Sequence, residues 1–422
     1  MISFLVVALK LIVLLGFLVF IHEFGHFIAA KLCKVKVNEF ALGFGPVLIS
    51  IQGKETKYQL RLIPLGGFVS MEGESSRSDS ERAFNKVSII KRILIVSAGG
   101  LVNIIVAILL FFGVQVFKGN NESTRVQSLI SNYPAEQAGI MQGDKIVKIN
   151  NKKMRRAKDI VDIVSKSKNN DLSIQIERNG EIIEFRITPN EVKYKSTGAY
   201  FESEESTIIE AFNKKNCIKD QGFKVGDKII SINNVNVEND VTKVAEVLQT
   251  VEDNKKAKFV IDRAGKNVEI EAEPVTEYSY LIGIGFEKEP QSLSNNLYYA
   301  WYSTGDFAFS IVDNLKTLIS GDVSSDDVMG PVGISKVVAK KTDGISEFLN
   351  IMALISLSLG ITNLFPFPPL DGGKNVLLII EAIRKKPLQE KHEAMIQMIG
   401  FSLIILLSLY VTYNDILKVF RI

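Results

Sequence analysis

The sequence predicts a polytopic α-helical membrane protein that carries an inserted α+β region between two of its spans. The 422 residues are 46% hydrophobic, with a mean hydropathy of +0.17, yet 23% of them are charged. This mixture is typical of membrane spans joined to soluble domains. Four stretches are apolar and long enough to cross a bilayer, and the segment between the second and the third contains a repeated strand pattern.

Each apolar stretch is expected to form one transmembrane helix. The first resembles a signal peptide, but its apolar run is too long, only Lys10 interrupts it and no basic segment precedes it. We therefore expect a permanent span. Cys33 and Cys217 lie far apart in the chain and do not indicate a disulfide framework. The expected helices cover residues 3–29, 93–117, 348–366 and 397–414, each to within a few residues.

The short loops predict the orientation of the chain in the membrane. Residues 31–92 contain eleven Lys and Arg residues, and five more lie at 374–391, between the third and fourth helices. Loops rich in Lys and Arg stay in the cytoplasm, so residues 118–347 and both termini are expected outside. The net charge of +3 and the lack of a long basic stripe argue against nucleic acid as a partner.

The outer segment contains an internal repeat. "QGDKIVKINN" at 142–151 recurs as "VGDKIISINN" at 225–234, and "IERNGEIIEF" at 176–185 recurs as "IDRAGKNVEI" at 261–270. The offsets are 83 and 85 residues. Each copy predicts a Gly-Asp turn, a short apolar strand, an Asn-Asn turn, a helix and a strand hairpin. Two modules of mixed strand and helix therefore follow one another.

The first module resembles a PDZ domain. "NYPAEQAGIMQGD" at 132–144 is similar to the bacterial PDZ signature, whereas "DQGFKVGD" at 220–227 keeps only its Gly-Asp end. PDZ domains bind peptide ends by adding a strand to a sheet edge. A spacing or steric role without peptide affinity stays open. Residues 296–320, which include the only Trp, Trp301, predict an amphipathic helix at the membrane surface, with packing against the second module as the alternative.

The first apolar helix carries a pattern that indicates a metal site. His22, Glu23 and His26 form H-E-x-x-H, and residues four apart share one face of a helix. Both imidazoles then point at one ion, which suits zinc, while Glu23 stands beside it as general base. The five-residue pattern also arises by chance, but polar groups inside a membrane helix are costly and usually functional. The third histidine, His392, lies in a polar stretch and is expected to be solvated.

A catalytic zinc needs a third protein ligand, and the end of the third apolar helix offers one. In "GITNLFPFPPLDGG" at 360–373 three prolines break the helix, and Asp371 follows directly, backed by two glycines that allow a close approach. Asn363 lies before the break, where its amide can contact substrate or a tetrahedral intermediate. An ordinary exit turn explains the prolines but leaves Asn363 unexplained.

These two motifs together resemble the site-2 protease family of intramembrane zinc metalloproteases. The total of four spans and the inserted modules look like its bacterial regulator-of-sigma-E protease branch. "GFGP" at 43–46, "LGGFVSMEGE" at 65–74 and "GPVGI" at 330–334 are similar to motifs of that branch. The resemblance implies one Zn²⁺ per chain, bound by His22, His26 and Asp371. It implies Glu23 as base and Asn363 as a substrate or transition-state contact.

The resemblance also implies a membrane-associated β-hairpin. Gly66, Gly67 and Phe68 would offer a strand edge to an unwound substrate helix. The implied divisions are an N-terminal membrane half (1–117, with the cytoplasmic hairpin loop at about 31–92), a first PDZ-like domain (118–195), a second, weaker one (196–290), an amphipathic interfacial linker (291–347) and a C-terminal membrane half (348–422).

The predicted function is intramembrane proteolysis. The enzyme would sit in a bacterial inner membrane and hydrolyse single-span substrates, such as anti-sigma factors or signal-peptide remnants, near the cytoplasmic face. The PDZ-like domains would lie on the extracytoplasmic side, bind peptide ends and filter substrates. The alternative is a catalytically silent PDZ-bearing membrane scaffold, although the intact set of Glu23 and three ligands argues against it. A metal transporter would need ionisable residues on several spans, and the second and fourth offer none.

Overall fold

The structure is a computed structural model that describes residues 2–74, 76–119, 121–203, 205–213, 216–320, 338 and 344–420. The "GPVGI" motif at 330–334 lies outside the described residues. The chain forms two compact units. The first combines residues 1–120 with 290–422, and the second spans 121–289.

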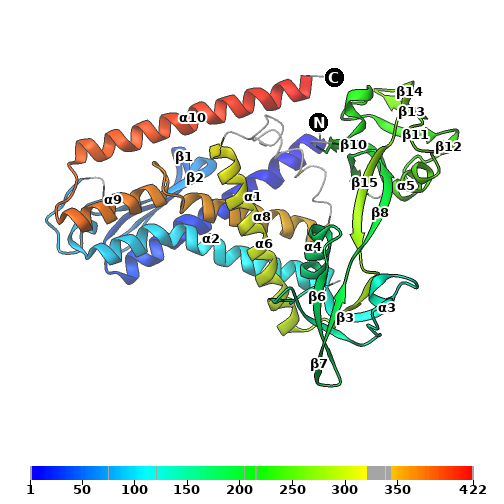
Figure 1. The fold of residues 1–422 in the computed structure, drawn as a ribbon. Coiled ribbons are helices and arrows are strands. Elements are labelled where there is room, and N and C mark those ends of the chain that lie inside the picture. Colours follow the sequence, from blue (N-terminus) through cyan, green and yellow to red (C-terminus); the bar gives the residue numbers. More distant parts are fainter. Residues whose placement is uncertain are drawn as a thin grey trace. The chain divides into compact units, whose positions relative to one another are not determined.

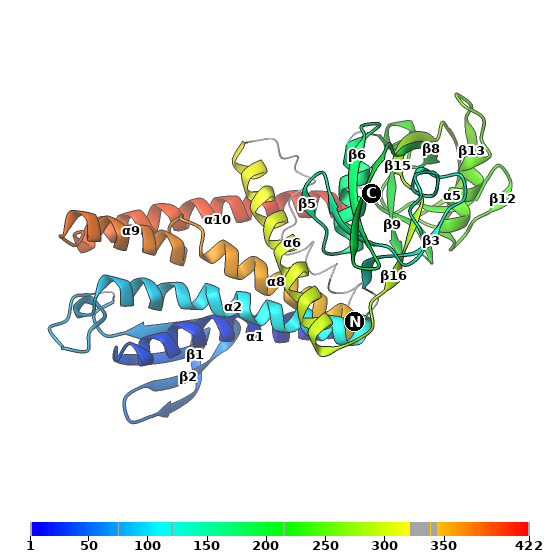
Figure 2. The same ribbon diagram turned by 60° about the horizontal axis from the view of Figure 1, so that its bottom comes forward.

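Among the described residues, four helices of the first unit are long and apolar enough to cross a membrane, which agrees with the predicted number of spans. The α2 helix packs against both α1 and α8 (Figures 1 and 2). Small residues permit this close approach: a Cβ on Gly25 would lie 2.6 Å from the carbonyl oxygen of Ala98, and one on Gly360 would lie 2.7 Å from that of Gly100. The four helices are α1 (Ile2–Leu32), α2 (Ile89–Lys118), α8 (Ile345–Asn363) and α10 (Glu390–Phe420).

The aromatic-rich stretch after the second unit is helical, as predicted. This helix, α6 (Leu293–Ser320), packs on α2 and α8, and Phe307 stacks on Phe111 of α2 at 5.5 Å between ring centroids. Trp301 remains 62% exposed. The contacts with two candidate spans fit a helix close to the membrane. Its place at the membrane surface stays a prediction.

The loop between α1 and α2 folds into a small sheet rather than a simple hairpin. Its strands are β1 (Val37–Gln52) and β2 (Lys57–Met71), followed by the short 3-10 helix η1 (Phe84–Lys86). Residues 39–42 pair with 67–70 on one side and with 57–60 on the other. Both strands are bent where the register of their pairing is irregular, so that residues 39–42 pair on both sides. Among the described residues, 67–70 have no strand partner on their outer side, so they form an edge of the sheet.

Within its described residues the second unit contains two six-stranded sheets with equivalent elements, which confirms the internal repeat. The first sheet has the order β16-β3-β4-β6-β7, with β5 beside β4, and the second has the order β14-β13-β11-β10-β9, with β12 beside β11. The first module holds β3 (Glu122–Leu129), α3 (Pro134–Gln137), β4 (Lys145–Ile149), β5 (Lys152–Lys153), α4 (Ala157–Ser167), β6 (Leu172–Arg178) and β7 (Glu181–Ile187). The second holds β9 (Ala199–Ser203), β10 (Ser206–Phe212), η2 (Ile218–Gln221), β11 (Lys228–Ile232), β12 (Val235–Asn236), α5 (Val241–Gln249), β13 (Ala257–Arg263) and β14 (Lys266–Ala272).

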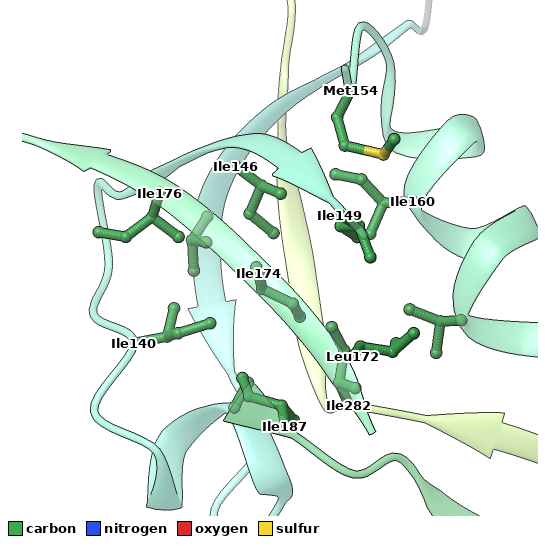
Figure 3. Close-up of a cluster of buried hydrophobic side chains, with 13 residues drawn as sticks. Ile140, Ile146, Ile149, Met154, Ile160, Leu172, Ile174, Ile176, Ile187 and Ile282 are labelled. Atoms are coloured by element: carbon green, nitrogen blue, oxygen red, sulfur yellow. The ribbon is translucent and has the colours of Figure 1, made fainter. Parts of the chain in front are cut away.

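Each module has its own hydrophobic core, built at repeat-equivalent positions. Figure 3 shows the first core, in which side chains from β4 and β6 meet α4. Ile146 and Ile174 there correspond to Ile229 and Phe259 in the second core, at the offsets of 83 and 85 residues seen in the sequence. The strand hairpin predicted for the second repeat is also present, and it turns at Ala264-Gly265, with positive φ at both residues as a type I′ turn requires.

A buried ion pair is repeated in the same way. The Arg178 guanidinium donates two hydrogen bonds of 2.7 Å to Asp144, and Arg263 donates two of 2.7 Å to Asp227. Both carboxylates are almost fully buried, with 2% and 1% of their side chains exposed. Bidentate geometry of this kind makes a buried pair favourable. The Gly-Asp turns of the two repeats are thus anchored to the hairpins that follow them.

The structure corrects the predicted boundary between the modules. The strand β16 (Ile284–Lys288), which follows the second repeat, pairs with β3 of the first module. Residues 284–288 were expected in the second domain (196–290). The equivalent strand β9 follows the first repeat and pairs with β10 of the second module.

The two connecting strands, β8 (Asn190–Ser196) and β15 (Val275–Leu281), pair with each other. Lys193 lies opposite Tyr278, and these two positions are themselves 85 residues apart. The pairing therefore has approximate two-fold symmetry about this point. The boundary differs from the predicted one because β9 and β16 carry the same local sequence pattern. The sequence alone therefore does not show which sheet each strand joins.

Candidate metal centre

Two elements far apart in the sequence bring three ligand groups together. His22 and His26 lie one turn apart on α1, and Asp371 is the first residue of α9 (Asp371–Arg384). The Asp371 Oδ2 atom lies 3.3 Å from the Nε2 atom of each histidine, and the two Nε2 atoms are 3.2 Å apart. Ligands at zinc bond lengths of 2.0–2.1 Å in a tetrahedron are separated by about 3.3 Å. The predicted ligands therefore form one face of a tetrahedron of the correct size.

The chemistry of these groups also fits a metal ion. Asp371 Oδ2 is buried and makes no hydrogen bond within the described residues. Such an atom is costly unless something else satisfies it, and a cation between the three groups does so. Burial raises the pKa of Asp371, but positive charge on the two imidazoles beside it, when they are protonated, outweighs burial and lowers that pKa overall; a cation between the three groups acts in the same direction. The ionised carboxylate, which is the ligand form, is therefore favoured.

Hydrogen bonds orient the two imidazoles. His26 Nδ1 lies 2.9 Å from the backbone oxygen of Ile95 on α2, an acceptor that assigns the proton to Nδ1 and leaves the Nε2 lone pair for a metal. His22 Nδ1 lies 3.5 Å from the side-chain nitrogen of Asn363, at the end of α8. When the Asn363 amide is turned so that its oxygen faces His22, that oxygen accepts a hydrogen bond from the Nδ1–H group of His22. The structure thus places Asn363 beside a predicted ligand.

Gly99 of α2 completes the centre, although the sequence reasoning did not identify it. A Cβ at this position would lie 2.3 Å from His26 Nε2 and 2.8 Å from His22 Nε2. Distances below 3.0 Å require atoms to move, so any larger residue here would displace at least one imidazole. The signal was present in the sequence as "AGG" at 98–100, a run of small residues inside an apolar helix.

A tight turn delivers Asp371 to the histidines. The α8 helix ends at Asn363, and the chain bends back before α9 begins. A Cβ on Gly372 would lie 2.2 Å from the backbone oxygen of Leu364, and one on Gly373 would lie 2.6 Å from the backbone carbon of Phe367. Close backbone packing therefore requires both glycines. The predicted helix break before Asp371 is present.

The edge of the β1-β2 sheet lies next to Glu23. A Cβ on Gly67 would approach the Glu23 Cγ atom to 3.0 Å and the backbone oxygen of Ala41 to 2.9 Å. Gly66 has a φ of 113°, which favours glycine, and the Arg61 guanidinium stacks over the Phe68 ring at 5.1 Å. All residues proposed from the sequence for the site, including the strand at 66–68, thus come from segments that meet around α1.

Comparison with known proteins agrees with this geometry. The sequence profile described as Peptidase family M50 matches residues 10–407. The chain belongs to peptidase family M50. A Clostridium acetobutylicum protein named "Putative zinc metalloprotease" is 31% identical over 95% of this chain and 94% of its own length. The "Regulator of sigma E protease" of Haemophilus influenzae is 28% identical over 96% and 98%.

A solved structure of the HtrA-type protease AlgW with a tripeptide covers 41% of this M50 chain and 66% of its own, at 12% identity. Its TM-score of 0.18 is too low to carry an argument. The family match and the relatives establish a zinc metalloprotease of the site-2 protease family. The four apolar helices make this M50 member a membrane protein.

Proposed function

We propose that this protease hydrolyses peptide bonds of transmembrane segments near the cytoplasmic face of a bacterial inner membrane. The observation that carries the proposal is the position of the ligand groups: His22 and His26 lie inside the candidate span Leu9–Leu32, at tetrahedral spacing from Asp371. One Zn²⁺ per chain fits the three groups. Such a site suits substrates that are themselves in the membrane, because a soluble peptide would have to leave water to reach it.

Zinc in a site of this kind supplies Lewis acidity and activates water for attack on a peptide carbonyl. Glu23 is adjacent to the ligands but is not one of them, so its carboxylate is free to accept a proton from the attacking water. It then returns that proton to the leaving amine. Asn363 orients His22 through Nδ1 and presents its amide to the substrate carbonyl. Glu23 can act as a base beside three ligands only if these side chains are held in a fixed geometry. Gly99 permits this geometry because it leaves room for both imidazoles.

The sheet edge at residues 67–70, which includes Gly67 and Phe68 and directly follows Gly66, is proposed to receive the substrate. A helical substrate hides its carbonyls in its own hydrogen bonds, so it must unwind before hydrolysis. Backbone groups on the outer side of Gly67 and Phe68 offer replacement hydrogen bonds by strand addition. Because Gly67 contacts Glu23, a strand added there passes directly beside the proposed base.

The second unit is proposed to lie on the extracytoplasmic side of the membrane and to select substrates. The basic loops at 31–92 and 374–391 favour the cytoplasm, which places residues 121–289 on the other side. Each module has a terminal sheet strand, β9 or β16, together with a helix, α5 or α4. PDZ-like domains bind peptide ends at such an edge. Peptide ends left by an earlier cleavage, as in anti-sigma factors or signal-peptide remnants, suit this arrangement.

A comparison of wild type with Glu23→Gln tests the proposal. Both proteins are purified in detergent, their zinc content is measured, and each is incubated with a single-span model substrate. We expect equal zinc in both and cleavage by wild type alone. Equal cleavage by both would remove Glu23 from the mechanism. Zinc binding without any cleavage by wild type would favour the alternative, a catalytically silent scaffold.

A further inference from the structure

Helix α9 is held to the N-terminal half of the chain by three polar contacts. Arg92 at the start of α2 donates to Glu381 through two hydrogen bonds of 2.7 and 3.1 Å. Lys374 donates to Glu74, just after β2, at 2.5 Å, and Asn375 donates to Ser97 of α2 at 2.9 Å. The Arg92 and Glu381 side chains are only 10% and 17% exposed. A bidentate pair with this degree of burial is a strong and directional contact.

These contacts share one face of α9 with the metal ligand. Asp371, Lys374, Asn375, Leu378 and Glu381 are spaced by three, one, three and three residues, which places them on a single helical face. Leu378 is buried in the core cluster that α1 and α2 also build. The face that presents Asp371 to the two histidines is therefore the face by which α9 is fixed.

The attachment of α9 matters because a metal ion requires its ligand atoms at precise distances. Asp371 supplies the ligand from α9, whereas α1 supplies the other two. Glu381 lies ten residues along α9 from Asp371, about 15 Å on a helix, so a tilt of about 4° at that end moves Asp371 by about 1 Å. Metal–ligand distances tolerate deviations of only about 0.2 Å. A loose α9 thus separates Asp371 from the histidines.

We propose that Arg92, Glu381, Glu74 and Lys374 are positioning residues for the metal centre. They act through Asp371 by fixing the tilt and the height of α9. Glu74 is held in turn by the chain that leaves β2, because the backbone N–H of Met71 donates to its carboxylate at 3.4 Å. The strand edge at 67–70, which Met71 directly follows, and the third ligand are thereby connected through one ion pair. The inference rests on the ligand set proposed above.

Metal affinity, rather than activity, is the appropriate measurement. Full-length wild type, Glu381→Gln and Lys374→Met are loaded with cobalt(II) in detergent, and affinity is measured by competition with a chelator. Polar groups that orient a ligand typically contribute about 10- to 100-fold to metal affinity, and we expect a loss in this range for Glu381→Gln. The visible ligand-field spectrum should also change, because the coordination geometry changes.

A control contact comes from the opposite end of α2, where that helix is paired with α8 instead of α9. Lys118 of α2 pairs with Glu347 of α8 at 3.1 Å, with 65% and 40% of the side chains exposed. Lys118→Ala breaks a contact between the same halves of the chain at the opposite end of α2, and it should leave cobalt affinity unchanged. An equal loss in Lys118→Ala and Glu381→Gln would overturn the proposal, since it would indicate general destabilisation.

A double-mutant cycle separates positioning from a general structural effect. In an Asp371→Ala background only the two histidines remain, so adding Glu381→Gln should not weaken cobalt binding further. An additive loss contradicts action through Asp371. If Glu381→Gln fails to fold, the exchanged pair Arg92→Glu with Glu381→Arg replaces it, and regained affinity is expected. Wild type without metal overturns the ligand set itself, whereas wild-type affinity in Glu381→Gln overturns the positioning role alone.

Discussion

Gly99→Ala gives a sharp test of how closely α1 and α2 approach at the metal centre. The added methyl group would lie 2.3 Å from His26 Nε2 and 2.7 Å from His22 Cε1, so at least one imidazole must move by about 1 Å to reach ordinary van der Waals contact. Overpacking of this size costs about 1–3 kcal/mol. If this overpacking destabilises only the metal-bound arrangement of the imidazoles, metal affinity decreases by about 5- to 150-fold, since 1.4 kcal/mol corresponds to a factor of ten.

The assay is metal competition against a chelator on the full-length protein, followed by cleavage of a single-span substrate. Gly113→Ala is the matched control, because it lies on the same helix and its added methyl meets only the flexible Leu349 side chain, at 3.3 Å. We expect weak metal binding and little cleavage in Gly99→Ala, with wild-type behaviour in Gly113→Ala. Wild-type metal affinity in Gly99→Ala would refute the close packing described here.

Three further predictions follow from the two units. Removing metal with a chelator should lower the thermal stability of wild type by mass action, but not that of His26→Ala; equal shifts would contradict the site. Burial raises the pKa of Asp144, but Arg178 and the Met141 N–H outweigh it and hold that pKa below its usual value. The stability that this carboxylate contributes is present at neutral pH and is lost as pH falls below about 4. In Asp144→Asn the free energy of unfolding of residues 121–289 should therefore decrease less steeply as the pH is lowered. A fragment 121–195, which lacks β16, should show poorly dispersed amide NMR signals, whereas 121–289 should be well dispersed; a folded short fragment would contradict the strand exchange.

Much of this architecture could be predicted because its causes are local. The spans follow from apolar length, and the helix at 2–32 brings His22 and His26 to one face through its own periodicity. The Pro-rich break fixes where α8 ends, so Asp371 could be named as a ligand before its position was known. The repeat could be detected because the Gly-Asp and Asn-Asn turns depend on backbone conformations that few residues adopt.

The remaining features depend on contacts between distant segments. The strands β9 and β16 begin within similar sequences, "GAYF" at 198–201 and "GIGF" at 283–286, so their exchange between sheets depends on tertiary pairing alone. Arg92 and Glu381 are 289 residues apart in the chain, and neither position has a pattern that indicates a partner. Gly99 is recognisable as important only once the histidines are seen against it.

Zinc K-edge X-ray absorption of the purified full-length protein, compared with Asp371→Ala, tests the central claim most directly. The account predicts one zinc per chain, with two imidazole nitrogens and a carboxylate oxygen among its ligands at about 2.0–2.2 Å. It also predicts loss or rearrangement of this signal in Asp371→Ala. A wild-type protein without zinc, or an unchanged spectrum in Asp371→Ala, would contradict it.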